Sequence, residues 1–198
     1  MNLKQTAIIA ALASLLTTAC SAPTPTPMDG TVTVQNCRWK PPSGWPTFAT
    51  ENTVVAVSAG DAEVTARDWG QRPAGEIIIR LSIQLHLDGA TAAEFASNLW
   101  RTENWVTGGG NAVAPWQEWP LPQVAPVTVG ALSGVQTDSI ERSVILRRYM
   151  LDLSPEKALY VAVWIPPGHA GLAAALESLE TLERLPLTSR GPGVGTIR

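Results

Sequence analysis

The sequence predicts an α+β fold in which a mainly antiparallel sheet is covered by helices. Residues 76–87, "EIIIRLSIQLHL", alternate between apolar and polar side chains as a long strand does. The period changes in residues 91–104, where apolar side chains recur at helical spacing. Strand patterns then return before a second helical pattern at residues 168–185. Blocks of strands separated by single helices are typical of this class.

The first strand block is made of short segments. Residues 31–39, "TVTVQNCRW", alternate and are rich in β-branched side chains, and the prolines of "PPSGWP" end that strand. Residues 52–59 predict another short strand, and residues 62–69, after a turn at Gly60, predict either a further strand or an irregular segment. In residues 76–87 the odd-numbered positions form an apolar face, and we expect the other face to be half exposed.

Two helices are expected, separated by an irregular connection and more strands. The first helix opens with Thr91 and Glu94, which have the spacing of a capping box. Residues 105–126 are rich in glycine, proline and tryptophan and predict a long irregular connection. The second helix, residues 168–185, carries leucines three and four positions apart. The strands between them are expected at residues 127–140, 142–153 and 158–166.

The chain begins with the layout of an export signal. Lys4 precedes an apolar segment, residues 6–16, which is shorter than the about 20 residues that cross a bilayer. Small residues lead from Thr17 into Cys20, an arrangement that resembles the lipobox of bacterial lipoproteins, with Thr17 where leucine is usual. That resemblance implies cleavage before Cys20 and acylation of its thiol, with palmitate among the chains expected.

These observations divide the chain into four parts. Residues 1–19 are predicted to be a lipoprotein-type signal peptide, and residues 20–30 a lipidated cysteine followed by a Pro/Thr-rich tether. Residues 31–186 are expected to form the folded domain. The tail, residues 187–198, is expected to be disordered.

The two cysteines leave an alternative open. The leader could instead be an ordinary secretory signal, and Cys20 would then be free to pair with Cys37. If Cys20 is acylated, Cys37 is a lone thiol that is either buried and inert or available for an intermolecular disulfide.

Charge and hydropathy limit the possible partners. The formal net charge is −3 at pH 7, which gives no indication of a nucleic-acid groove. No later apolar run approaches the length of a membrane span, so attachment would depend on the lipid alone. The expected location is the cell envelope, on the outer face of the cytoplasmic membrane or in the outer membrane.

The sequence offers no catalytic constellation. Only two histidines occur, His86 and His169, and neither belongs to a cluster with zinc-ligand spacing. The segment "GALSG", residues 130–134, places Ser133 one position too late for a nucleophile elbow. The glycines at 108–110 follow a predicted helix, whereas a phosphate loop follows a strand. We therefore expect no catalytic residue, no metal and no cofactor.

Tryptophan is the unusual enrichment, with eight residues against two phenylalanines and two tyrosines. Trp105, Trp116 and Trp119 frame the glycine- and proline-rich connection. If exposed, they would form a recognition surface for a protein, a sugar or a membrane. Alternatively, their rings fold back and pin the connection to the sheet as a small satellite cluster.

The order of segments resembles the PsbP family of photosystem II extrinsic proteins. The resemblance rests on "PPSGW" before the strands, a helix after the first strand block, "GALSG", "RRYMLDL", "ALYVAVWIPPG" and a final amphipathic helix. It covers residues 31–185 and depends on order and spacing more than on identical residues. It implies an α/β/α sandwich and a binding or assembly subunit with no enzymatic activity.

The leading hypothesis is therefore a lipid-anchored, non-enzymatic envelope protein that binds a partner or supports assembly of a membrane complex. A second hypothesis is a lipoprotein that holds a hydrophobic or glycan ligand in a tryptophan-lined pocket between sheet and helix. A hydrolase using His86 or His169 is the third.

Overall fold

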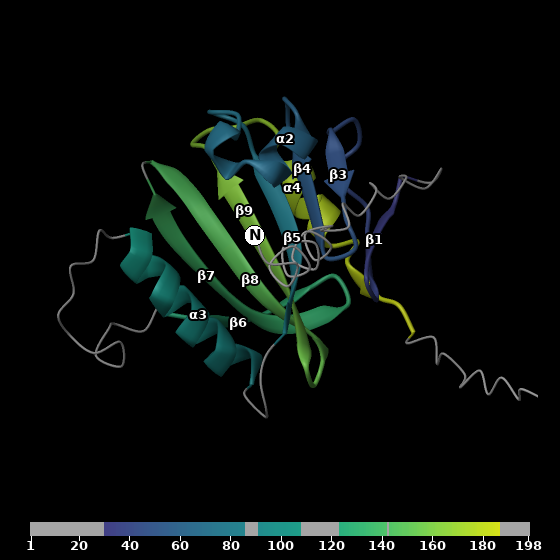
Figure 1. Ribbon diagram of the computed structural model, residues 1–198, viewed down its shortest axis with the longest axis vertical. Helices are drawn as coiled ribbons and strands as arrows, with labels where there is room; N and C mark the ends of the chain where they lie inside the picture. The colour runs from purple at the N-terminus through teal and green to yellow at the C-terminus, as the bar shows by residue number, and fades with distance from the viewer. Residues whose placement is uncertain (1–29, 86–90, 108–122, 142, 187–198) are drawn as a thin grey trace, which may run out of the picture.

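The structure, a computed structural model, describes residues 30–85, 91–107, 123–141 and 143–186. It confirms the α+β class, because a large antiparallel sheet carries helices on both faces (Figure 1). The leader, the tether and the tail predicted from the sequence lie outside the described residues.

Seven strands form the large sheet, and every neighbouring pair is antiparallel. The strand order is β3-β4-β5-β9-β8-β7-β6, so β9 is inserted beside β5 at the centre. The strands are β3 (Thr47–Ala49), β4 (Thr53–Val57), β5 (Ile78–Leu85), β6 (Ala125–Val129), β7 (Leu132–Glu141), β8 (Val144–Ser154) and β9 (Lys157–Ile165).

A second, three-stranded sheet joins the two ends of the domain. β1 (Val32–Val34) pairs with β2 (Cys37–Trp39), and β2 pairs with β10 (Glu183–Arg184). Trp39 is fully buried, and its indole Nε1 donates a hydrogen bond to the carbonyl oxygen of Ser178 at 2.9 Å. That bond fastens the small sheet to the last helix.

Strand β5 is buried on its core face along its first half, whereas on the opposite face buried side chains alternate with the half-buried Arg80 and Gln84. Ile79 and Leu81 face the main core, and Ile78 on the opposite face is only 2% exposed. The prediction that this second face is half exposed is confirmed at Arg80 and Gln84 and wrong at Ile78, which packs into a separate apolar cluster with residues of β4 and α2. Exposure is highest at the last residue of the strand.

Helix α3 (Ala92–Thr107) begins as the sequence predicts. The Oγ1 of Thr91 accepts a hydrogen bond from the Glu94 amide, while the Glu94 carboxylate accepts one from the Thr91 amide. This reciprocal pair is a capping box, and it satisfies donors that the first helical turn would otherwise leave free.

Helix α4 (Leu172–Leu179) is shorter than predicted. Residues 168–171 form turns before it, and after Glu180 the chain turns into β10. The leucine spacing continues beyond the helix because Leu182 is also buried in the main core, although it precedes a strand.

Residues 62–69 form a helix, α2 (Ala62–Arg67), followed by the 3-10 turn η1 (Trp69–Gln71), and neither the predicted strand nor an irregular segment. The Asp61 side chain caps α2 by accepting from the amides of Glu63 and Val64. Ala62 and Thr65, three positions apart, face inward. Six residues with alternating polarity satisfy a strand template and a helix template equally well, and the Asp61 cap decides between them.

The two faces of the large sheet are covered differently. Helix α4 and the small sheet pack on one face and enclose the main core. On the other face, α2 contacts β3 and β4, while α3 contacts β7 and β8 (Figure 1). The cover on this second face is therefore split into two parts over the two halves of the sheet.

Candidate functional site

Most of the residues singled out from the sequence lie outside the described part of the chain. This applies to Cys20, His86, Trp116 and Trp119. Trp105 falls within α3, which continues to Thr107, so the prediction that an irregular connection begins at residue 105 is wrong. Neither interpretation of the three tryptophans is tested, and both remain predictions.

One polar cluster unites three side chains that are far apart in the sequence. Ser58 follows β4, Glu76 precedes β5, and His169 precedes α4. The Ser58 hydroxyl donates to Oε2 of Glu76 at 2.5 Å, and Nε2 of His169 lies 3.3 Å from the same oxygen. Nε2 of His169 is also 3.4 Å from Oγ of Ser58. The three side chains therefore form a triangle at one end of the sheet.

Backbone groups fix the orientation of this cluster. The amide of Ile77 donates to Oγ of Ser58 at 2.9 Å, and the amide of Gly171 donates to Nδ1 of His169 at 3.0 Å. Because Nδ1 accepts a hydrogen bond, the proton of the neutral imidazole is on Nε2. The Nε2–H group then donates toward Glu76 and Ser58.

This tautomer decides what the cluster can do. A serine nucleophile needs a neighbouring base, yet here the nitrogen that faces Ser58 already carries a proton. Metal ligation by Nε2 would also require that proton to leave. The arrangement is therefore a clamp between β4, β5 and the start of α4, and not a catalytic triad or a metal centre.

Glu76 is the charged member of the clamp. The hydrogen bond from Ser58 is the largest effect and lowers the pKa of the Glu76 carboxyl below its ordinary value of 4.5. Burial opposes this shift, and the neighbouring His169 adds to it. The ionised carboxylate is thus the form that the cluster stabilises. Within the described residues, no group of three or more His, Cys, Asp or Glu side chains is placed to hold a metal ion.

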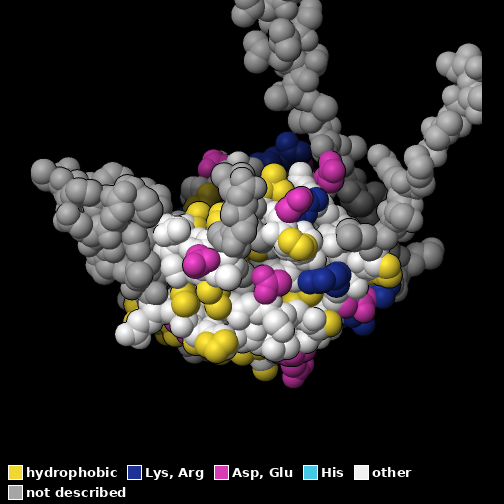
Figure 2. Space-filling model, turned by 90° about the horizontal axis from the view of Figure 1, so that it is seen from below, with side chains coloured by type: hydrophobic (Ala, Val, Ile, Leu, Met, Phe, Trp, Pro, Cys, Tyr) yellow, Lys and Arg dark blue, Asp and Glu magenta, His cyan; other side chains and the backbone are white. Residues whose placement is uncertain are grey.

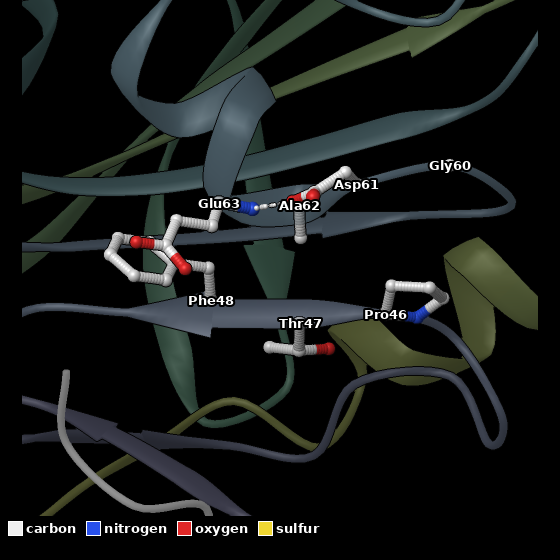
Figure 3. Close-up of a pocket in the computed structure, with 7 residues that line it drawn as sticks. All are labelled: Pro46, Thr47, Phe48, Gly60, Asp61, Ala62 and Glu63. Atoms are coloured by element: carbon white, nitrogen blue, oxygen red, sulfur yellow. Dashed lines mark hydrogen bonds between the residues drawn. The ribbon is translucent and has the colours of Figure 1, made fainter.

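A shallow depression of about 330 Å³ lies between the edge strand β3 and the start of α2 (Figure 3). Its polar groups are engaged locally, because Oδ1 of Asp61 accepts from the amides of Glu63 and Val64 at 2.9 and 3.0 Å. Phe48 forms part of the wall, and the guanidinium of Arg67 lies 5.7 Å from its ring centre. The depression is open and offers a ligand no free, buried polar group.

The strip of sheet between the two helical covers carries one basic and two aromatic side chains beside three buried small or aliphatic ones. We call it the β5–β9 strip; it consists of Ile78, Arg80 and Ser82 on β5 and Tyr160, Ala162 and Trp164 on β9. The ring of Trp164 contacts that of Trp69 in η1, with ring centres 4.2 Å apart.

A buried arginine borders this strip on β8. Arg148 is 1% exposed, and it pairs across the sheet with Ala162. Its guanidinium donates to the Ser139 hydroxyl at 3.2 Å and lies 5.6 Å from the ring centre of Trp100, which belongs to α3. Trp100 is fully buried between helix and sheet, as expected for a core residue.

The β7–β8 hairpin presents apolar side chains to solvent at its end. Ile140 and Ile145 are direct cross-strand partners, and their exposed fractions are 79% and 38%. The next pair on the same face, Asp138 and Arg147, forms a bidentate ion pair with its closest contact at 2.8 Å. The hydrogen bond that Arg147 donates to Asp138 is the main cause that raises the pKa of Arg147.

Cys37 is buried in the main core, which answers the question left by the sequence in favour of a buried thiol. Burial is the largest cause that raises its pKa from 9.0 to about 12, and the nearby Glu183 carboxylate adds to it. A thiol that does not ionise near neutral pH is a poor nucleophile and a poor partner for disulfide exchange.

Sequence reasoning missed the Ser58–Glu76–His169 clamp, because its members come from three separate segments and match no local motif. The only available indication was the scarcity of histidine. The "GALSG" segment is explained by packing: a Cβ atom on Gly130 would lie 2.3 Å from the carbonyl oxygen of Leu182. Among the described residues, no helix has both the length and the hydropathy required to span a membrane.

Comparison with known proteins gives no family. No protein-family model matches the chain, and no curated protein sequence matches it. A crystal structure of a protein from Bacteroides thetaiotaomicron is similar, with a TM-score of 0.42 and 12% sequence identity. The match covers 78% of this chain and 48% of that protein, so the chain spans about half of its length.

Proposed function

We propose that this chain is a lipid-anchored envelope protein that binds a protein partner, as a subunit that supports a membrane complex and not as an enzyme. Cys20 would carry the lipid, and residues 20–30 would tether the domain to the outer face of the cytoplasmic membrane or to the outer membrane. The PsbP-like resemblance of residues 31–185 supports a binding role.

The exposed end of the β7–β8 hairpin is the observation on which partner binding rests. Ile140 and Ile145 lie side by side, and Ile140 is largely exposed to water. Each apolar side chain that becomes buried contributes roughly 25 cal/mol for every Å² removed from water. A neighbouring pair of large aliphatic residues at a strand end is therefore a suitable anchor for a partner surface.

The hairpin end is also preorganised. Asp138 and Arg147, the pair beside the two isoleucines, hold the two strands together through a bidentate ion pair. A surface that is already ordered loses little side-chain and loop entropy when a partner binds. The polar pair would form a rim beside the apolar contact.

Crosslinking of the anchored protein in its native membranes, followed by mass spectrometry, tests this function. We expect capture of a stoichiometric membrane-complex protein, with crosslinks on the β7–β8 hairpin. Replacing both isoleucines, Ile140→Thr with Ile145→Thr, should reduce capture several-fold. Leu85→Thr is the matched control, because Leu85 is 67% exposed at the opposite end of the sheet. Equal capture by the double variant and the control would refute the hairpin as the contact.

Small-molecule binding is a second candidate, favoured by the contact between Trp69 and Trp164 on the β5–β9 strip. Both rings are only half-buried, and Arg72 stacks 5.1 Å from the Trp69 ring centre. A ligand that binds only the folded state raises the melting temperature, so a thermal-shift screen distinguishes this candidate from the first. If no hydrophobic or glycan ligand in the panel raises the melting temperature, small-molecule binding is excluded as a candidate function.

A further inference from the structure

Arg80 lies in the middle of the β5–β9 strip in an apolar setting. Its direct cross-strand neighbours are Val55 on β4 and Ala162 on β9, and both are fully buried. Trp164 and Tyr160 flank Ala162 along β9. The Arg80 side chain itself is half-buried, so its charge is partly removed from water.

Arg80 differs from the other arginines in its partners. The structure gives Arg80 no hydrogen bond and no ion pair to any described residue. Each of the other arginines with described side chains has a polar partner on the protein: Arg38, Arg67, Arg72, Arg147, Arg148 and Arg184. Arg80 is thus a cation held in an apolar strip without a counter-charge among the described residues.

Glu63 and Asp68, two acidic groups at α2 and η1, have partners of their own. Glu63 of α2 pairs with Arg67 at 2.8 Å. Asp68, which caps η1, accepts from the Gly70 amide and from the side chain of Gln71. The side chains of β5 and β9 that share this face include no carboxylate. A bound anion would therefore supply the missing charge.

The surroundings restrict the kind of anion. One guanidinium group matches one carboxylate in a bidentate pair, whereas a phosphate dianion favours several cations. The neighbouring Arg148 is already engaged by Ser139 and stacked on Trp100. Apart from the buried Ser82, the rest of the strip is aromatic or aliphatic, which suits an alkyl chain more than a sugar.

We propose that the β5–β9 strip binds the carboxylate of a fatty acid, with Arg80 paired to the carboxylate and the alkyl chain lying against Trp164 and Tyr160. This inference rests on the second candidate function, small-molecule binding at the same strip, and it depends neither on the partner-binding role nor on lipidation of Cys20. It assigns Arg80 as a ligand-binding residue.

Isothermal titration calorimetry of the full-length Cys20→Ser chain with decanoate tests the inference. We expect binding at one site, and a loss of about tenfold or more in affinity for Arg80→Gln, because a charge-assisted hydrogen bond is removed. Arg38→Gln is the matched control, since Arg38 is exposed in the small sheet. Its affinity should equal that of the parent chain.

Decan-1-ol provides a test that needs no variant. It has the same chain length but no charge, and it should bind the parent chain at least about tenfold more weakly than decanoate. If Arg80→Gln does not fold, the inference is tested by comparing decanoate with decan-1-ol on the parent chain and by the affinity of Arg80→Lys for decanoate. The inference fails if decanoate does not bind, if the alcohol binds equally well, or if Arg80→Gln binds decanoate as tightly as Arg38→Gln does.

Discussion

Glu76 makes the stability of the clamp depend on pH. Its pKa in the folded protein is lowered below 4.5, chiefly by the hydrogen bond from Ser58. A lowered pKa contributes stability that is present above the unfolded value and is lost as the pH falls through the folded value. The contribution of the carboxylate should therefore be complete at neutral pH and disappear in the acid range below 4.5.

We predict that the difference in unfolding free energy between the wild-type chain and Glu76→Gln is largest near neutral pH and shrinks steadily below pH 4.5. Urea titrations at a series of pH values measure it. Ser58→Ala should lose about 1 kcal/mol at neutral pH and show a weaker dependence on pH, because the main cause of the pKa shift is removed. A difference that stays constant, or grows in acid, would contradict this.

The burial of Cys37 predicts an unreactive thiol. In the Cys20→Ser chain, where Cys37 is the remaining cysteine, we expect negligible reaction with a thiol reagent in native buffer at pH 8. One equivalent should react after unfolding in urea. Rapid reaction in native buffer, or a disulfide-linked dimer on a non-reducing gel, would show that the thiol is accessible.

At the residue scale, the sequence predicts burial better than it predicts polar contacts. The alternation around Cys37 and Trp39 predicts a strand, and both side chains are indeed buried on one face. The Ser58–Glu76–His169 clamp could not be predicted, because it requires the pairing of β4 with β5 and the position of the loop before α4. The missing counter-charge of Arg80 likewise becomes visible only when β9 lies beside β5.

At the scale of elements, the turn between β6 and β7 depends on Gly130. Its φ is +56°, and a Cβ atom there would clash with the backbone at Leu182 and Glu180. Gly44 has a similar φ of +80° with open space around it. The two glycines therefore separate the cost of the backbone conformation from the cost of the clash.

We predict that Gly44→Ala destabilises the protein by about 1 kcal/mol, the cost of a left-handed conformation. Gly130→Ala should cost at least about 2 kcal/mol more, because the turn must move away from the backbone of Glu180 and Leu182. Urea denaturation of both variants measures the difference. Equal losses in the two variants would mean that the close approach at Gly130 does not constrain the fold.

Long elements with strong patterns are predicted correctly, and short ones are not. The capping box at Thr91 and Glu94 locates the start of α3, since both halves of the motif are local. Helix α2 has six residues, too few for periodicity to separate a helix from a strand. The end of α4 is also missed, because buried Leu182 keeps the leucine spacing after the helix has ended.

At the scale of the whole molecule, the α+β class follows from the order of patterns along the chain, but the strand order does not. Placing β9 beside β5 requires contacts between residues far apart in the sequence, for which the sequence of one protein carries no local indication. Surface composition does not indicate a binding site on the face seen from below, because apolar, acidic and basic side chains are interspersed there (Figure 2). The hairpin end stands out only because its exposure is known.

The proposed function requires that the domain be held at a membrane through Cys20. Fractionation of cells that express the full-length chain, with intact-mass analysis of the membrane fraction, tests this most directly. We predict that the mature wild-type protein begins at Cys20 and carries the mass of acyl chains. The Cys20→Ser protein should instead be found in the soluble fraction or keep its signal peptide. An unmodified Cys20, or a Cys20→Ser chain with the same mature terminus and the same membrane attachment, would contradict a lipid-anchored role.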